Sequence, residues 1–275
     1  MRSSILRVGS VPYLVGRPLD SGLEHEPEFH VERRVPAELV TALRAGELDV
    51  ALVSSIELFR RPGYRYLDGI AVAGAGFVGS VQVFLRRPIE SVRTIALDPA
   101  SAAAATLVQV LLAPRATGRA AVDFVAVDAR ASARDAGTDA WLAIGDPALR
   151  ETLSQGALPA FNPSAEWHRT TGLPFVFATW IVRPGVELTP EHLAAFARAR
   201  VRGGAQVEGL ATRASREWSL PRAACEKYLR EECRYEPGPD MERALFAFRD
   251  RAAALGLCEQ DLRPAAIQGV TAHVT

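Results

Sequence analysis

One stretch of this chain, Gly172-Leu-Pro-Phe-Val-Phe-Ala-Thr-Trp180 with Ile181-Val182 after it, is an almost unbroken run of β-branched and aromatic residues. Such a run predicts a strand that is buried on both faces, as in the sheets of α/β proteins. Pro174 and Pro184 mark its two ends. A second run, Ser80–Leu85, has the same character. We interpret these two strands as the places where the chain crosses from one lobe to another and back.

The segments around these crossings alternate between strand and helix patterns. Strand patterns at 49–53, 94–97 and 140–144 are each followed by a helix signal, and from residue 190 onward the pattern becomes helical. We therefore predict an α/β protein with lobe one at 1–86 and 184–275 and lobe two at 87–183. Two crossings between two lobes predict a hinged central cleft that holds the ligand.

Composition excludes several classes of function. The chain has 32 basic and 32 acidic side chains, which argues against a nucleic-acid partner. Three cysteines without CxxC spacing and five scattered histidines give no metal site, and we expect no cofactor. Gly74, Gly76 and Gly79 form G-x-G-x-x-G, but this segment precedes a strand and so fails as a dinucleotide motif.

The expected location is the cytoplasm. No apolar run approaches the ~18–20 residues that span a bilayer, so we expect no membrane partner. The N-terminal residues lack the apolar region of a secretion signal. The sequence does not indicate the oligomeric state.

Polar residues follow two of the predicted strands, and each group can be interpreted either as a helix cap or as a ligand contact. Ser54 and Ser55 follow the strand at 49–53, and Glu57 stands three residues after Ser54, as in a capping box. This segment is either a helix cap or a binding site for a carboxylate. Asp146, after Gly145, is either an N-cap or a ligand contact.

Several segments together resemble the MqnA-type chorismate dehydratases of the futalosine route to menaquinone. The matching segments span nearly the whole chain in order: 8–14 with 17–19, 48–57, 76–80, 144–149, and Trp167 with 171–180, with a weaker match from 228–229 through 256–257. The resemblance implies the two-lobed fold of type II periplasmic binding proteins with a hinged central cleft. It also implies a carbon–oxygen lyase (hydro-lyase) that converts chorismate to 3-[(1-carboxyvinyl)oxy]benzoate without a cofactor or metal.

The resemblance also implies a set of site residues. Ser80 falls on a serine that is important in the family and is the expected catalytic residue. The base would be the substrate's own carboxylate, so orientation and hydrogen bonding would carry the catalysis. The remaining matched positions are expected to bind a chorismate-like carboxylate: Tyr13, Val15, Arg17, Ser54, Ser55, Ser101, Gly145, Asp146, Thr171, Pro174 and Phe175.

This chain departs from the family pattern at two places. Val15 stands where the family has an asparagine, and valine neither donates nor accepts a hydrogen bond. Ser101-Ala-Ala-Ala104 replaces a helix start that carries an arginine and two further hydroxyls in the family. Both changes make the expected cleft less polar.

Two alternatives remain, of which the first is favoured by these departures and the second shares the expected fold. One is a non-catalytic intracellular binding protein that closes on a small, more apolar carboxylate. The other is the sister enzyme that makes 1,4-dihydroxy-6-naphthoate, although the segments Ser54–Glu57 and Thr171–Trp180 argue against it.

Overall fold

The chain folds around two mixed β-sheets. The computed structural model describes residues 5–113, 121–128 and 131–269, so the ends of the expected lobe one, 1–4 and 270–275, lie outside the described residues. The six-stranded sheet contains β1 (Leu6–Ser10), β2 (Phe29–Arg33), β3 (Val50–Ser54), β4 (Arg65–Gly74), β10 (Phe175–Val182) and β11 (Ala265–Ile267). The five-stranded sheet contains β5 (Val81–Leu85), β6 (Thr94–Leu97), β7 (Asp123–Ala126), β8 (Ala140–Ile144) and β9 (Ala160–Phe161).

Each sheet combines parallel strands with an antiparallel one. The six-stranded sheet has the order β11-β4-β10-β3-β1-β2, in which β1 is parallel to β2 and β3 and β10 is antiparallel to β3 and β4. The five-stranded sheet has the order β7-β6-β8-β5-β9, in which β5 is antiparallel to β8 and β9. The carboxyl ends of β1 and β3 therefore lie at one edge, where α/β folds place their ligands.

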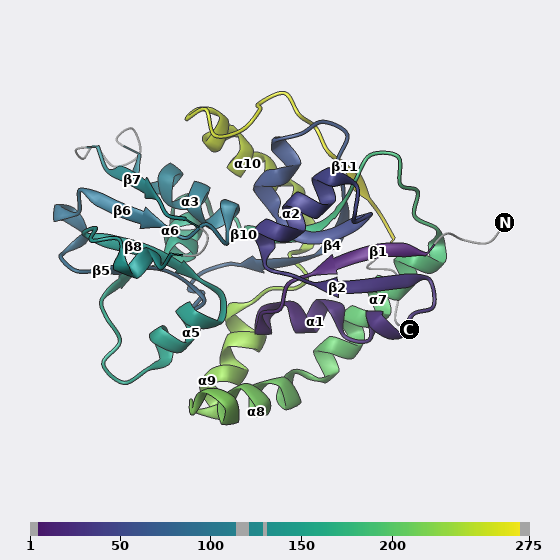
Figure 1. Cartoon of the computed structure of the whole chain (residues 1–275), viewed down its shortest axis with the longest axis horizontal. Helices are drawn as coiled ribbons and strands as arrows, with labels where there is room; N and C mark the ends of the chain where they lie inside the picture. The colour runs from purple at the N-terminus through teal and green to yellow at the C-terminus, as the bar shows by residue number, and fades with distance from the viewer. Residues whose placement is uncertain (1–4, 114–120, 129–130, 270–275) are drawn as a thin grey trace.

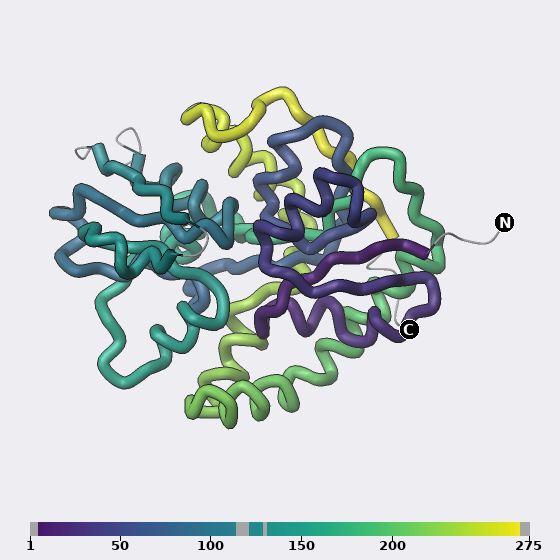
Figure 2. Tube along the Cα trace, in the orientation of Figure 1, coloured from purple at the N-terminus to yellow at the C-terminus, as the bar shows by residue number. Residues whose placement is uncertain are grey.

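Figure 1 shows the five-stranded sheet at the left and the six-stranded sheet at the right, with helices packed around both. They are α1 (Arg17–Asp20), α2 (Pro36–Ala45), α3 (Ala102–Leu112), α5 (Gly145–Leu153), α6 (Pro163–Thr171), α7 (Pro190–Ala205), α8 (Val207–Trp218), α9 (Arg222–Lys227) and α10 (Met241–Ala253). The Cα trace in Figure 2 shows the five-stranded sheet at the left, and the segment with α8 and α9 reaching back beneath it.

The positions of two strands differ from those expected. The expected boundaries assigned Val81–Leu85 to lobe one and Phe175–Val182 to lobe two, but β5 lies in the five-stranded sheet and β10 in the six-stranded sheet. These strands are not themselves the crossings. The chain crosses in the segment after β4 and returns after α6, so we propose that lobe two extends from about residue 79 to residue 173.

The return crossing is built by the 167–175 segment. Gly172 ends α6 in the left-handed conformation (φ 69°), and its N–H donates to the His168 carbonyl at 2.8 Å. The Trp167 indole N–H donates to the Pro174 carbonyl at 3.1 Å. Phe175 then packs edge-on against Trp167, with ring centroids 5.5 Å apart. The stretch therefore turns a helix of one lobe into a central strand of the other.

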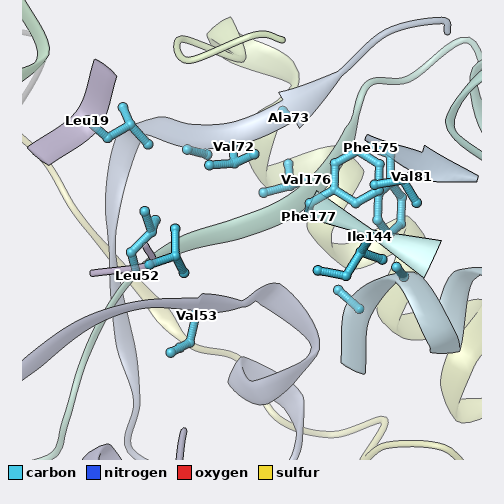
Figure 3. Packing of buried hydrophobic residues seen from close by; sticks show 14 of the residues in the cluster. Leu19, Leu52, Val53, Val72, Ala73, Val81, Ile144, Phe175, Val176 and Phe177 are labelled. Atoms are coloured by element: carbon cyan, nitrogen blue, oxygen red, sulfur yellow. The ribbon is translucent and has the colours of Figure 1, made fainter. Parts of the chain in front are cut away.

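A single hydrophobic core connects the two sheets. It includes buried residues of β3, β4 and β10 together with residues of β5, β6, β8 and α3. Figure 3 shows part of this cluster, with Val72 and Ala73 near Val176 and Phe177, and Ile144 facing them from the other sheet. Because apolar burial is the main favourable term in folding, this shared core stabilises both sheets.

Candidate functional site

A cavity of about 70 Å³ lies between the two sheets. Its walls come from the loop after β1, from the ends of β3 and β4, from β10, and from the first crossing. The lining residues are Val11, Tyr13, Val15, Pro36, Leu52, Val53, Ser54, Val72, Ala73, Val78, Ser80, Val81, Ser101, Ile144, Gly145, Phe177, Ala178 and Cys233.

Most of this lining is apolar, and Figure 3 shows several of these side chains around the space between the sheets. The polar groups are the hydroxyls of Tyr13, Ser54, Ser80 and Ser101 and the thiol of Cys233. The lining contains no lysine, arginine, histidine, aspartate or glutamate. Such a site recognises its ligand by shape and a few hydrogen bonds.

Ser80 stands at the start of β5, where the first crossing enters the five-stranded sheet. Its side chain is 5% exposed, and its carbonyl accepts the Gly145 N–H at 2.8 Å. Its Oγ accepts the hydroxyl of Tyr228, also at 2.8 Å. Ser80 is thus fixed on both sides, by a neighbouring strand end and by a residue of the C-terminal helices.

Ser101 caps α3 at the cavity wall. Its Oγ accepts the Ala104 N–H at 3.2 Å, which explains why a serine precedes this alanine-rich helix. The first N–H groups of a helix have no partner within the helix. Because Ser101 lines the cavity, the start of α3 lies at its wall, and helix starts favour anions such as carboxylates.

Tyr13 lines both this cavity and a second, larger one of about 380 Å³. Its ring lies over Gly145, whose φ of 69° suits glycine. A Cβ at Gly145 would approach Tyr13 Cδ1 to 3.2 Å, so glycine also allows the close contact. Burial raises the pKa of the Tyr13 hydroxyl, which therefore stays protonated at neutral pH.

Asp146 connects the two lobes directly. The Leu14 N–H donates to its two carboxylate oxygens at 3.0 and 3.3 Å. Burial raises the pKa of Asp146 to about 6 despite this hydrogen bond. Asp146 does not cap α5, where Ile144 holds the N-cap position, and it does not line the cavity.

Replacement of Asp146 by asparagine is expected to stabilise the protein at pH 8. Because the pKa in the folded protein is raised from 3.8 to about 6, the cost of burying the charge is present above pH 6. The side-chain oxygen of asparagine can still accept the hydrogen bond from the Leu14 N–H, but asparagine carries no charge. We expect a gain of about 1–2 kcal/mol in the free energy of unfolding, an amount discounted for partial exposure. Urea denaturation at pH 8 and pH 4 measures it. The gain should shrink as pH falls from 6 to 4, and equal gains at both pH values would contradict this account.

Two of the expected binding residues have structural partners instead. Arg17 donates to the Val11 carbonyl and pairs with the buried Asp20 at 2.7 Å, and it does not line the cavity. Burial lowers the pKa of Arg17. The Ser55 hydroxyl is fully buried and donates to the Val176 carbonyl at 2.6 Å, which ties the turn after β3 to β10.

The segment Thr171–Phe175 also lies outside the cavity lining. The Thr171 hydroxyl donates to the Trp167 carbonyl at 2.7 Å and accepts the Leu173 N–H at 3.1 Å. Pro174 and Phe175 support the return crossing described above. The cavity is lined by Phe177 and Ala178, farther along the same strand.

The capping-box interpretation of Ser54 and Glu57 is wrong. Ser54 makes no side-chain capping bond, and the residues after it form a short 3₁₀ turn, Ser55–Phe59. The Glu57 carboxylate instead binds Arg44 of α2 through two bonds of 2.7 and 2.6 Å. Ser54 is consequently left to line the cavity.

The structure thus brings six expected residues to the cavity: Tyr13, Val15, Ser54, Ser80, Ser101 and Gly145. It adds Cys233, which no motif indicated, and Tyr228 behind Ser80. The only advance signal for Tyr228 was its place in the weak match at 228–229. Burial raises the pKa of the Cys233 thiol to about 12, so it stays a neutral wall residue.

Within 5–113, 121–128 and 131–269, no group of three or more histidine, cysteine, aspartate or glutamate side chains could hold a metal ion. None of the helices in this part of the chain combines the length and the apolar character that a membrane crossing requires.

Solved structures with the same architecture belong to the periplasmic-binding-protein class. A protein from Archaeoglobus fulgidus aligns with a TM-score of 0.74 at 17% identity, over 94% of this chain and 100% of its own. The alkanesulfonate-binding protein SsuA from Xanthomonas axonopodis pv. citri aligns with a TM-score of 0.65 at 17% identity, over 94% and 95%. A Candida albicans protein described as having the generic periplasmic binding protein fold aligns with a TM-score of 0.58 at 10% identity, over 96% and 97%. Two mixed sheets with a cavity between them therefore define this chain as a periplasmic-binding-protein-like α/β fold.

Sequence comparison places the chain within that class. Residues 6–254 match the family described as menaquinone biosynthesis, and the chain belongs to this family. A chorismate dehydratase from Thermus thermophilus is 29% identical over 201 residues, which cover 62% of this chain and 70% of the relative. A chorismate dehydratase from Campylobacter jejuni is 28% identical over 190 residues, which cover 69% of each.

Proposed function

We propose that this protein is a chorismate dehydratase that converts chorismate to 3-[(1-carboxyvinyl)oxy]benzoate in the futalosine route to menaquinone. The observation that carries the proposal is the family match over 6–254, together with two relatives of that name. As a hydro-lyase of a biosynthetic route, it is expected to act in the cytoplasm.

The chemistry requires little of the protein. A ring C–H bond and the C–O bond of the ring hydroxyl break, the proton and the hydroxide leave as water, and the ring becomes aromatic. The residues that line the cavity include no acid or imidazole that could take the ring proton, and the Cys233 thiol is protonated. We therefore assign the base to the substrate's own carboxylate, held in place by the cavity.

The lining residues supply binding and orientation. The free N–H groups at the start of α3 and the Ser101 hydroxyl would hold one carboxylate. The Ser80 hydroxyl would donate a hydrogen bond to a substrate oxygen on which charge develops. The surrounding apolar residues exclude water and strengthen both interactions.

Substrate entry requires the cavity to widen. Its volume of about 70 Å³ is well below the roughly 300 Å³ at which ligand pockets usually begin. Entry is expected through the larger cavity of about 380 Å³, which Tyr13 also lines. For this the Leu14–Asp146 hydrogen bond and the Tyr13–Gly145 contact would open, as in a hinge motion.

A second candidate function is favoured by one observation. Val15 faces the cavity where the family has an asparagine, and no cation lines the cavity. A non-catalytic binding protein for a small, more apolar carboxylate would fit such a lining.

Incubation with chorismate separates the two candidates. The dehydratase is expected to release the enolpyruvyl benzoate, which chromatography detects, and chorismate should raise the melting temperature. Stabilisation by chorismate without turnover would instead support the binding protein. A folded protein that neither converts chorismate nor is stabilised by it would overturn the dehydratase assignment.

A further inference from the structure

A π-helical turn lies directly behind Ser80. The helix α9 continues into the turn Tyr228–Glu232, which ends with the Cys233 N–H donating to the Tyr228 carbonyl at 3.0 Å. Turns of this kind are rare and occur frequently at functional sites. Here the turn brings Tyr228 and Cys233 to the same place, so that one supports Ser80 and the other lines the cavity.

The turn is anchored to the first crossing and to β4. The Gly79 N–H donates to the Glu232 carboxylate at 2.9 Å. Ala73 and Arg234 exchange two backbone hydrogen bonds, of 2.9 and 2.7 Å. The residue before Ser80 and the strand before the crossing are therefore both attached to the segment that carries Tyr228, which fixes the two hydroxyls relative to each other.

The direction of the Tyr228–Ser80 hydrogen bond follows from the available acceptors. The Tyr228 side chain is 1% exposed, and its hydroxyl lies 2.8 Å from Ser80 Oγ and beside the Cys233 thiol. Oxygen is a stronger acceptor than sulfur, so the phenol donates to Ser80. Burial also raises the pKa of Tyr228 well above its usual range, which keeps this donor proton in place.

The Ser80 proton must then point elsewhere. Among the residues that the structure describes, Ser80 Oγ has no acceptor for its own hydrogen, and its one hydrogen-bond partner is Tyr228. Because Ser80 lines the cavity, the remaining direction for that hydrogen is toward the cavity.

We propose that Tyr228 is a positioning residue that directs the Ser80 hydroxyl hydrogen into the cavity, where it donates to an oxygen of the bound substrate. The inference rests on the proposed dehydratase function and adds a residue to it. Tyr228 does not touch the substrate, and no proton leaves Ser80: the hydroxyl acts as a fixed hydrogen-bond donor.

The test is the Tyr228→Phe variant, assayed with chorismate. Loss of the phenol hydroxyl frees Ser80 to rotate, so kcat should fall by about 10- to 100-fold while KM changes by less than about threefold. In a Ser80→Ala background the same substitution should have no further effect on kcat, because the hydroxyl that it positions is already absent.

Tyr235→Phe is the matched control. Tyr235 is also buried, at 5% exposure, and interacts with Cys233, but its hydroxyl makes no hydrogen bond in the described structure. Its kcat should equal that of the unmodified protein, whatever happens to its melting temperature. A merely structural role of Tyr228 would lower the melting temperature of Tyr228→Phe and leave its kcat intact.

The possible results separate the inference from the function. Failure of the unmodified protein to convert chorismate would overturn the dehydratase and the inference with it. Turnover by the unmodified protein with an unchanged kcat in Tyr228→Phe would overturn the inference alone. Additive losses in the double variant would also overturn it, because they would show that the two hydroxyls act separately.

Discussion

Replacement of Ser80 by alanine is expected to lower kcat for chorismate by about 100- to 1000-fold. The Ser80 hydroxyl is held by Tyr228 at 2.8 Å and faces a cavity whose lining offers few other hydrogen-bond donors. A donor fixed in place before the reaction stabilises developing charge without reorganisation. Its removal should therefore act mainly on the transition state, so that kcat and kcat/KM fall by similar factors.

Ser55→Ala provides the matched control. Ser55 is also a buried serine, but its hydroxyl donates to the Val176 carbonyl at 2.6 Å and lies outside the cavity lining. Its loss should cost about 1–3 kcal/mol of stability by leaving a buried acceptor unpaired, with kcat unchanged below the melting temperature. A Ser80→Ala variant that keeps full activity would show that the hydroxyl is not used in the reaction.

Replacement of Phe175 by alanine is expected to lower the free energy of unfolding by about 3–5 kcal/mol. Phe175 is 1% exposed, and its ring contacts Trp167, Phe177 and Phe248 edge-on, with centroids 5.5, 4.7 and 4.7 Å away. Removal of the ring leaves a void at the centre of the shared core, and the surrounding aromatic side chains cannot collapse into it completely.

Urea denaturation measures this loss, and kinetics below the lowered melting temperature test the alternative role. A core residue should leave KM for chorismate unchanged in the folded fraction. A raised KM with full stability would instead restore Phe175 to the substrate-binding residues expected from the family motif. Phe175→Leu is a milder companion variant that fills part of the void and should recover part of the loss.

The elements of this fold could be predicted from local pattern, but their pairing could not. The apolar runs at 140–144 and 175–182 and the helix at 102–112 lie where their residue types indicate. The sheet that receives β10 depends on partners more than 100 residues away in the sequence, such as Val53 and Val72. Local composition carries no information about that choice, so the two strands at the crossings were assigned to the wrong lobes.

The residues of the candidate site could likewise be predicted from the sequence only where a local motif marks them. Ser80, Tyr13 and Ser101 follow from motif position and line the cavity. Glu57 was expected to cap its own turn, but its carboxylate binds Arg44 on a separate helix, an ion pair that no short window reveals. Tyr228 lies in a segment with an ordinary helical pattern, and one extra residue in a turn leaves that pattern almost unchanged. Residues placed by such long-range contacts are found only in the structure.

The position of β10 between β3 and β4 also matters during synthesis on the ribosome. β3 and β4 are made early, whereas the strand that fills the gap between them emerges after the whole five-stranded sheet. Until then the facing edges of β3 and β4 carry unpaired N–H and C=O groups on two apolar strands, and such edges template aggregation. Chaperone protection of the nascent chain during this interval is therefore expected to raise the yield of native protein.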